Sequence, residues 1–304
     1  MSILPDKILL ATDGSDDAAL AATAAVDLSK RTGAELHIVH ARRPLSHDAY
    51  PSLVPERYQA PYEEGARRVL EGQVGRIEQA GGTVAEAHLV LGRPADAILD
   101  LGERIGADLI VVGSRGLGRV KRLLVGSVSG SVVHHAKRPV LVVRGGAGQW
   151  PPTQVLIGDD LSEDAHGAAE LGVTLGKLME AETLLVHTYE GMPPHPETLP
   201  RDDRELYESM VEKHLRQVEP ALEGRAAELA DAHGLRPQVR IVPGESAHML
   251  SEIAEEGDRP TLLAVGSRGL GAGERMLVGS VSTKVLMAAR GPVLVCPLRT
   301  RYGA

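Results

Sequence analysis

Two segments of the chain carry glycine, serine and arginine at a spacing that suits the binding of a phosphate group. Residues 113–129 read GSRGLGRVKRLLVGSVS and residues 266–282 read GSRGLGAGERMLVGSVS, so that 13 of 17 positions are identical. Each segment follows a short apolar run, and its final Ser-Val-Ser is expected to open a helix. A glycine-rich loop between a strand and a helix lets backbone N–H groups surround an anion, and the helix dipole favours negative charge there.

The glycine positions distinguish these segments from other nucleotide motifs. Gly113 and Gly116 can adopt positive φ and leave room for a phosphate against the backbone. Gly126 and Ser127 then mark the helix start, where N–H groups lack helical partners. A P-loop would need lysine after its second glycine, and a dinucleotide fingerprint would follow the first strand; the sequence has neither. The alternative is structural, because Ser often caps a helix and Gly often forms a turn after a strand.

The two segments differ in charge. The basic residues of the first are Arg115, Arg119, Lys121 and Arg122; those of the second are Arg268 and Arg275, accompanied by Glu274. A loop that covers phosphates gains affinity from cations and loses it through a carboxylate. The sequence therefore predicts two sites of unequal strength, the first being the stronger.

The duplication extends over the whole chain and predicts two domains. Residues 7–13 match residues 154–160, residues 36–40 match residues 183–187, and residues 139–143 match residues 292–296. The offset grows from 147 to 153, so the second half has gained a few residues in its middle. Gly and Pro are dense over residues 144–152, as in a linker. We therefore predict a first domain at 1–146, a linker at 147–153 and a second domain at 154–304.

Within each half, apolar β-rich runs alternate with helical patterns. In the first half, strands are predicted near 6–12, 35–40, 84–90, 108–112 and 139–143, and helices near 16–32, 57–80, 94–105 and 127–137. Near-continuous apolar strands are typical of a parallel sheet covered on both faces. The pattern predicts two tandem Rossmann-like α/β domains, each with a five-stranded parallel sheet flanked by helices.

A ligand in such a fold lies beyond the carboxyl ends of the strands. Asp13 and Asp160 end the first strand of their halves, and Gly113 and Gly266 end the fourth. We expect the aspartate and the glycine of each half to lie close together. Asp13 has a second interpretation, since it can cap the helix that begins near residues 15–17.

Composition excludes several classes of protein. The net charge is −8, and the chain has no Phe, one Trp and six Tyr, which argues against a nucleic-acid binder. The apolar runs are far shorter than a membrane span, and the N-terminus lacks the pattern of a secretory signal. The lone Cys296 rules out an intrachain disulfide and agrees with a reducing cytoplasm. His37 and His40 lie three apart on one predicted strand and face opposite sides, so we predict no metal site among the side chains.

At this point the sequence resembles the universal stress protein family. The resemblance rests on Ala11-Thr12-Asp13-Gly14-Ser15, on Val39, and on the spacing Gly113-x2-Gly116-x9-Gly126-Ser127. It covers essentially the whole chain as two tandem copies, and the glycine spacing matches the ATP-binding version of the family. The resemblance implies a fold of the adenine nucleotide alpha hydrolase-like type, with ATP in the crevice and any Mg²⁺ held by the phosphates.

The resemblance also implies roles for individual residues. Asp13, at the end of the strand that carries Ala11 and Thr12, would contact the adenosine, and Val39 would offer backbone hydrogen bonds to the adenine. The ribose and phosphates would be lined by Gly113, Arg115, Gly116, Gly126, Ser127, Val128 and Ser129. The matching residues of the second half are Asp160, Val186, Gly266, Arg268, Gly269, Gly279, Ser280, Val281 and Ser282. There, Asp159 replaces Thr12, and an extra carboxylate beside a polyanion predicts weaker binding.

These observations favour an ATP-binding regulatory or stress-response protein that acts through its nucleotide state and its partners, without efficient catalysis. One alternative is a weak ATPase or phosphoryl-transfer enzyme, although no base stands out in the sequence. Another is a nucleotide-independent dimerising scaffold. The final strands at 139–143 and 292–296 are apolar and would lie at sheet edges, so we predict that they pair inside one chain as a pseudo-dimer, and that chains then form a homodimer.

Overall fold

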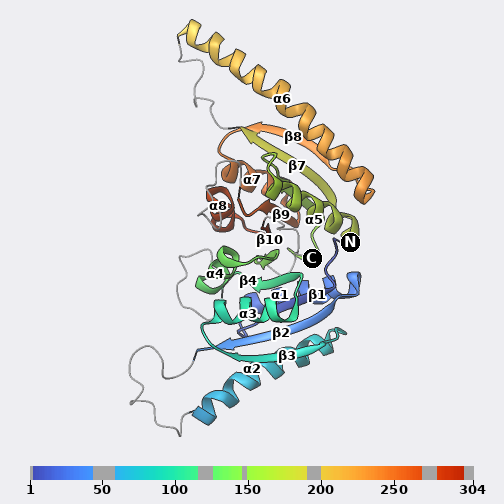
Figure 1. Ribbon diagram of the computed structural model, residues 1–304, viewed down its shortest axis with the longest axis vertical. Coiled ribbons are helices and arrows are strands. Elements are labelled where there is room, and N and C mark those ends of the chain that lie inside the picture. The colour runs from blue at the N-terminus through green and yellow to red at the C-terminus, as the bar shows by residue number, and fades with distance from the viewer. Residues whose placement is uncertain are drawn as a thin grey trace.

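The chain forms an α/β structure around one sheet of ten strands (Figure 1). The computed structural model describes residues 3–43, 59–115, 126–145, 149–189, 200–268 and 279–297. The strands of the first half are β1 (Lys7–Ala11), β2 (Glu35–Arg42), β3 (Glu86–Leu91), β4 (Leu109–Gly113) and β5 (Val140–Val143). Those of the second half are β6 (Gln154–Gly158), β7 (Glu182–Tyr189), β8 (Gln238–Pro243), β9 (Thr261–Gly266) and β10 (Val293–Cys296).

The helices follow the predicted alternation with the strands. The first half contains α1 (Asp16–Thr32), α2 (Gln59–Gln79), α3 (Pro94–Ile105) and α4 (Ser127–His135). The second half contains α5 (Glu163–Met179), α6 (Arg201–His233), α7 (Ser246–Glu255) and α8 (Ser280–Ala288), with a short 3₁₀ turn at Glu256–Asp258. The element order predicted from the sequence is confirmed, and the bounds in the first half agree to within a few residues.

The strand order explains where a ligand site can form. It runs β3-β2-β1-β4-β5 in the first half and β8-β7-β6-β9-β10 in the second, with parallel pairing inside each half. The order reverses direction between β1 and β4, and again between β6 and β9. Connections leave these neighbouring strands on opposite faces of the sheet, so a crevice is expected at their carboxyl ends.

The final strands of the two halves pair with each other. β5 and β10 are antiparallel, with Val142 opposite Val293 and Leu141 opposite Leu294. All residues of both strands are buried. An apolar strand at a sheet edge leaves its backbone groups unpaired, and each edge here supplies the partner of the other. The predicted contact between the last strands of the two halves is therefore present.

Two apolar layers, one on each face of the sheet, form the core. Alternate strand residues face α1, α2, α5 and α6 on one side, as Leu10 and Val111 do. The intervening residues, such as Leu9 and Val112, face α3, α4, α7 and α8 on the other side. Each layer runs through both halves, because the sheet is continuous across β5 and β10.

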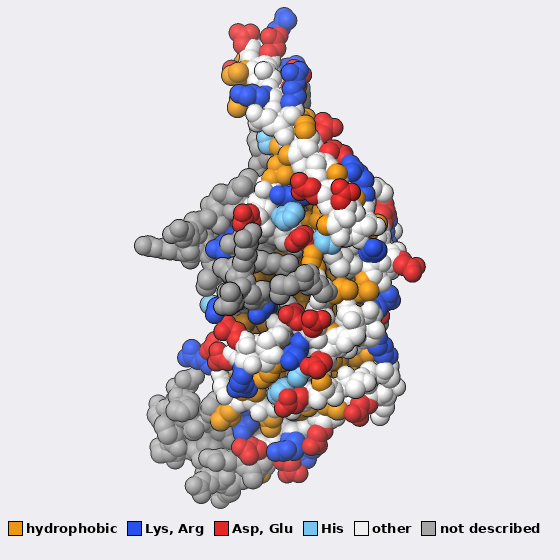
Figure 2. Space-filling view, turned by 45° about the vertical axis from the view of Figure 1, so that its right-hand side comes forward, with side chains coloured by type: hydrophobic (Ala, Val, Ile, Leu, Met, Phe, Trp, Pro, Cys, Tyr) orange, Lys and Arg blue, Asp and Glu red, His pale blue; other side chains and the backbone are white. Residues whose placement is uncertain are grey.

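The second half differs from the first mainly in α6. This helix has 33 residues against 21 in α2, and it lies between β7 and β8, where the second half has gained a few residues. It extends beyond the sheet (Figure 1), and Figure 2 shows acidic and basic side chains interspersed over its outer part. None of the helices in the described ranges has an apolar stretch of the length that a membrane span requires.

Candidate functional site

In the first half, the carboxyl ends of β1 and β4 are joined by hydrogen bonds at the reversal of strand order. The hydroxyl of Ser15, which follows β1, donates to the carbonyl of Arg115, which follows β4, at 3.2 Å. The backbone N–H of Gly126, just before α4, donates to the carbonyl of Ser114 at 2.7 Å. The predicted neighbours after β1, after β4 and at the start of α4 are thus brought to one edge of the sheet.

Asp17, in the first turn of α1, fixes the turn after β4. Its Oδ2 accepts from the hydroxyl of Ser114 at 3.1 Å and from the backbone N–H of Arg115 at 3.0 Å. The guanidinium Nε of Arg115 lies 3.3 Å from the same oxygen. A carboxylate is also favoured in a first helical turn by the helix dipole. Asp17 therefore sets the direction in which Arg115 leaves β4.

The second half repeats this arrangement around Asp164. Its Oδ2 accepts from the hydroxyl of Ser267 and from the backbone N–H of Arg268, both at 3.0 Å. The Nε of Arg268 lies 3.6 Å away. We did not single out either aspartate from the sequence, although the recurrence of an acid at matching positions of both halves was a signal that could have found them.

Gly113 and Gly266 are required for a reason other than the predicted one. Neither has a positive φ, so Gly113 does not adopt the conformation that the sequence suggested for it. A Cβ on Gly113 would lie 2.7 Å from the backbone carbon of Asp17, and one on Gly266 would lie 2.7 Å from that of Asp164. The start of α1 therefore packs directly on the end of β4, and the start of α5 packs directly on the end of β9. Glycine at these positions lets the helix approach and brings its acidic first turn to the site.

The starts of α4 and α8 are capped differently from those of α1 and α5. Their N-cap residues, Gly126 and Gly279, provide no side-chain cap, whereas Ser15 and Ser162 cap α1 and α5. A helix start without a side-chain cap keeps N–H groups that can bind an anion. Both helices begin with an exposed serine, at positions 127 and 280.

The third residue of each of these helices points inward. The hydroxyl of Ser129 donates to the carbonyl of Ser114 at 2.8 Å, and that of Ser282 donates to the carbonyl of Gly266 at 2.6 Å. Both serines are buried. These hydroxyls fix the helix start against the preceding strand, while the side chains of Ser127, Val128 and Ser280 are exposed and that of Val281 is half-buried.

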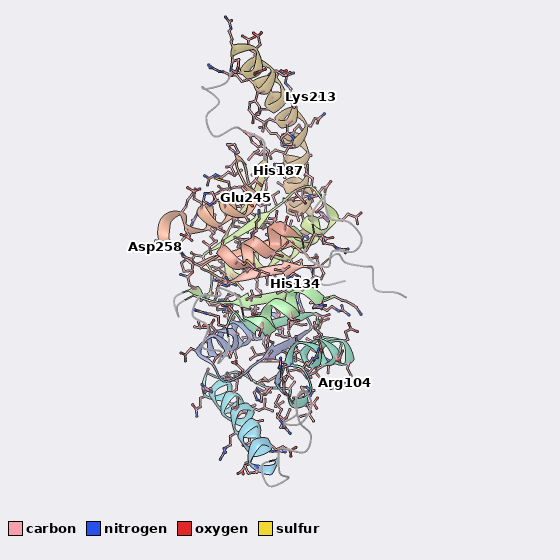
Figure 3. All side chains as sticks on the ribbon, turned by 90° about the vertical axis from the view of Figure 1, so that its left-hand side faces the viewer. Arg104, His134, His187, Lys213, Glu245 and Asp258 are labelled. Carbon is pink, nitrogen blue, oxygen red and sulfur yellow. The ribbon has the colours of Figure 1, made fainter. Side chains whose placement is uncertain are left out.

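The end of β1 is joined to β2 in the same way as the end of β6 is joined to β7. Thr12, which follows the buried Ala11, donates its backbone N–H to the carbonyl of Val39 at 2.9 Å. In the second half, the backbone N–H of Asp159 donates to the carbonyl of Val186 at 2.8 Å. Nδ1 of His40 lies 2.8 Å from the carbonyl oxygen of Thr12, and Nδ1 of His187, labelled in Figure 3, lies 2.7 Å from that of Asp159. Because a carbonyl only accepts, each histidine is the donor. Val39 and Val186 have buried side chains, so only their backbone edge can meet a ligand.

Asp13 and Asp160 occupy the turn between the first strand and the first helix of each half. Oδ1 of Asp13 accepts from the N–H of Ser15, and Oδ1 of Asp160 accepts from that of Ser162, each at 3.0 Å. The helices themselves are capped by the serines. Each aspartate therefore stabilises the turn before the helix and does not itself cap the helix, and both side chains are partly exposed at the site.

The extra carboxylate of the second half is neutralised inside the protein. Arg225 of α6 places Nη1 2.6 Å from Oδ1 of Asp159, whose side chain is fully buried. In the first half, Thr12 at the matching position donates its hydroxyl to Gln73 of α2 at 3.3 Å. The predicted repulsion between Asp159 and a bound polyanion therefore loses its basis, since Arg225 compensates that charge.

A buried arginine, Arg144, adds positive charge to the first half. Arg144 directly follows β5 and is 4% exposed, and its Nη1 donates to the carbonyl of Ala289 at the end of α8, at 2.9 Å. Burial, with the charge of Arg115, lowers the pKa of Arg144 to about 10, although Asp17 opposes the shift. Arg144 therefore remains charged at neutral pH. Its Nε and Nη2 atoms have no hydrogen-bond partner among the described residues, and the matching position of the second half is Pro297.

Several predicted site residues lie outside the described residues. They are Gly116, Arg119, Lys121 and Arg122 in the first half, and Gly269, Glu274 and Arg275 in the second. The described residues alone form, in each half, a helix start with open N–H groups beside an arginine that an aspartate holds in place. This arrangement can bind an anion.

Comparisons with known proteins identify the family of the chain. The model of the universal stress protein family matches residues 5–144 and again residues 152–297. A Thermus aquaticus protein described as a universal stress protein in the QAH/OAS sulfhydrylase 3′ region is 44% identical over 143 residues, which cover 45% of this chain and 97% of that protein. A putative universal stress protein of Staphylococcus haemolyticus is 39% identical over 142 residues, or 45% of this chain and 84% of that protein.

A solved structure extends the similarity to both halves. The crystal structure of a universal stress protein from Archaeoglobus fulgidus has a TM-score of 0.67 and 25% sequence identity, and the match covers 96% of each chain. The family model alone covers most of the chain. The chain therefore belongs to the universal stress protein family and contains two tandem copies of its domain.

Proposed function

We propose that this chain binds ATP at the carboxyl edge of each half and acts as a regulatory stress protein through its nucleotide state. The observation that carries the proposal is the start of α4, which lacks a side-chain cap and lies beside the turn that Asp17 holds in place. Open N–H groups and a helix dipole bind phosphate oxygens, and Arg115 supplies a cation next to them. The same set of groups is repeated at α8, Asp164 and Arg268.

Backbone groups bind the adenosine in this proposal. The carbonyl of Val39 accepts one hydrogen bond from Thr12, and a carbonyl oxygen has a second lone pair for the exocyclic amine of an adenine. Asp13 lies in the adjacent turn with a partly exposed carboxylate, which suits the hydroxyl groups of a ribose. A base held by backbone and aliphatic groups is compatible with the scarcity of aromatic residues in the chain.

The first site is proposed to bind a triphosphate more tightly than the second. Arg144 and Arg115 are near enough for their charges to interact, so both contribute positive potential at the carboxyl end of β4 and β5. The second half has Pro297 where the first has Arg144, and it therefore lacks one of these charges. The proposed difference in affinity between the two sites thus rests on a cation that the second half lacks at position 297 and not on the carboxylate of Asp159.

The proposal is a binding function with slow or no turnover. Phosphoryl transfer needs a metal, a cation clamp and a group that orients the nucleophile. Among the described residues at this edge, arginines provide the clamp, while Asp13 and Asp17 accept backbone N–H groups that hold the turns. Mg²⁺ would be bound through the phosphates of the nucleotide.

Four further features are part of the proposal. They are the domain limits 1–146 and 154–304, a pseudo-dimer built on the β5–β10 contact, a homodimer of chains, and a cytoplasmic location.

Release of the bound ligand tests the proposal. The purified full-length chain is denatured and the released small molecules are identified by mass spectrometry, and the empty protein is then titrated with ATP by calorimetry. We expect ATP to be released or to bind, with a tighter and a weaker site. ATP turnover with Mg²⁺ is measured on the same samples, and Gly116→Glu serves as the variant that blocks the first site. A chain that neither carries nor binds an adenine nucleotide would be a scaffold, and steady turnover abolished by Gly116→Glu would make it an enzyme.

A further inference from the structure

We propose a zinc site at the outer edge of the first half, formed by His37 of β2 with Glu86 and His88 of β3. His37 and Glu86 are opposite each other in the parallel ladder, and His88 follows two residues later on the same face of β3. One donor atom from each residue, an imidazole nitrogen or a carboxylate oxygen, lies within 4.8 Å of the other two. Two imidazoles and a carboxylate are a ligand set that Zn²⁺ accepts.

The distances between the donor atoms suit one small cation. Nδ1 of His37 lies 3.2 Å from Nε2 of His88. Two nitrogens that each lie ~2.05 Å from a tetrahedral zinc ion are separated by ~3.3 Å. Oε2 of Glu86 lies 3.7 Å from the same Nε2 of His88, and the Glu86 side chain is 64% exposed, so it is free to move closer. The three atoms therefore need only a small adjustment to bind the ion.

A second carboxylate orients His37 for this role. Oε2 of Glu35 lies 3.5 Å from Nε2 of His37, and Nζ of Lys7 lies 3.5 Å from Oε2 of Glu35. Since a carboxylate accepts, the proton of His37 is placed on Nε2, and the lone pair of Nδ1 points toward His88. Histidine ligands of zinc commonly donate their other N–H to a carboxylate in this way, which fixes the tautomer and strengthens the ligand.

The setting leaves one coordination position open. The side chains of His37 and His88 are 8% and 13% exposed, whereas Glu86 lies at the surface of the edge strand. Three protein ligands with one open side leave a position for water, the pattern that distinguishes reactive from purely structural zinc sites. Arg104 of α3, labelled in Figure 3, is a nearby cation that acts electrostatically on His88 and opposes binding of a metal ion.

The cluster is specific to the first half. The positions that match His37, Glu86 and His88 in the second half are Leu184, Gln238 and Arg240. Arg240 there pairs with Glu256 at 2.7 Å, so this edge is held by an ion pair. The duplicated fold therefore does not require the histidine pair. The other explanation of the histidine pair is a hydrogen bond between two stacked imidazoles, whose ring centroids are 5.5 Å apart. A test of the proposal must therefore distinguish a zinc site from a hydrogen-bonded histidine pair.

Titration of the metal-free, full-length chain with Zn²⁺ tests the proposal. Calorimetry without nucleotide, in competition with a chromophoric chelator, is expected to show one equivalent of zinc bound tightly to the wild type. Glu86→Gln, an exposed change that keeps shape, is expected to weaken binding at least ~10-fold, and His88→Gln to abolish it. Arg104→Gln is expected to strengthen binding, because it removes a like charge. His248→Gln is the matched control, since His248 and Glu252 form an exposed pair of the same composition, 3.8 Å apart, in the second half.

Two further measurements make the result decisive. Substitution by Co²⁺ is expected to give the visible absorption of a tetrahedral complex, which disappears in His88→Gln. Circular dichroism of each variant verifies that the fold is retained, and Glu86→Gln covers the case in which His88→Gln fails to fold. Zinc that binds the wild type and both variants equally, or no stoichiometric binding to the wild type, would overturn the proposal and leave a hydrogen-bonded histidine pair.

Discussion

The guanidinium of Arg225 lies 2.6 Å from the fully buried carboxylate of Asp159, at the point where β6 ends. The backbone N–H of Leu161 donates to the same carboxylate oxygen at 2.7 Å. The pair stands where the first half has the neutral pair Thr12 and Gln73. In the first half, a hydrogen bond thus joins the end of the first strand to the helix α2. In the second half, an ion pair joins the end of the first strand to the helix α6.

Removal of Arg225 is predicted to destabilise the second half. Arg225→Ala leaves a buried carboxylate without its counter-charge, and loss of one member of a buried pair costs about 3–5 kcal/mol. Urea unfolding of the full chain, followed by circular dichroism, measures the change. The double variant Asp159→Thr with Arg225→Gln reproduces the pair of the first half and is expected to recover most of the loss. Equal destabilisation by the single and the double change would contradict the role of the charge.

Gly113→Ala is predicted to weaken both the fold and nucleotide binding. The added Cβ would lie 2.7 Å from the backbone carbon of Asp17, so α1 must shift away from β4 and loosen the hold of Asp17 on Arg115. We expect the free energy of unfolding to fall by about 1–3 kcal/mol, as for overpacking in a core. The affinity of the first site for ATP is expected to fall by a larger fraction of its wild-type value than the free energy of unfolding does. Gly72→Ala is the control, because a Cβ there meets nothing within 4 Å, and alanine inside α2 is expected to stabilise the chain slightly. Normal ATP affinity in Gly113→Ala would refute the coupling.

Arg144→Gln is predicted to lower the affinity of the first site for ATP about 10-fold, or ~1.4 kcal/mol, and to leave AMP binding nearly unchanged. The reason is that the charge of Arg144 is proposed to act on the terminal phosphates and not on the adenosine. Calorimetry with ATP and AMP on the wild type and the variant measures the difference. Pro297→Arg, which places an arginine at the matching position of the second half, is the complementary change and should narrow the gap between the two sites.

The same residue predicts a dependence on pH. Burial lowers the pKa of Arg144 to about 10, so its charge persists through neutral pH and is lost as the pH rises past that value. The advantage of wild type over Arg144→Gln in ATP affinity is therefore expected to be constant between pH 7 and 8.5, and to shrink as the pH approaches about 10. An advantage that already disappears near pH 8 would point to a different titrating group.

The single tryptophan reports on the join between the two halves. Nε1 of Trp150 donates to Oδ2 of Asp27 on α1 at 3.1 Å, and the chain has one Trp in total. Asp27→Ala is predicted to shift the emission of Trp150 and to destabilise the chain by about 1 kcal/mol, the usual net contribution of a hydrogen bond. Arg31→Met serves as control, because it removes the 2.8 Å contact of Arg31 with Asp27 and the 3.0 Å hydrogen bond of Arg31 to the carbonyl of Leu178 but keeps the hydrogen bond between Asp27 and Trp150. An emission shift in both variants would argue against this assignment.

Local patterns were sufficient to predict the elements, the duplication and the edge of the sheet at which the candidate site is assembled. Short apolar runs and helical periodicity are properties of neighbouring residues, and they predicted β1, β4 and the start of α4 close to their actual bounds. The order of elements then implied a Rossmann-like sheet with a ligand beyond the carboxyl ends of its strands. The same reasoning was wrong about Gly113, because it assumed that a glycine after a strand serves its own φ angle, whereas this glycine makes room for α1.

Side-chain partnerships between distant residues were decided only by the tertiary structure. Asp17 meets Arg115 across 98 positions and Asp159 meets Arg225 across 66, and both contacts depend on how a helix packs on the strand end. The histidine pair depends on the register of β2 against β3, which places His37 opposite Glu86 and brings His88 within 3.2 Å. A sequence specifies which residues face the core through its local period. Which charge finds which partner follows from strand register and helix packing, and these are fixed only when the whole chain has folded.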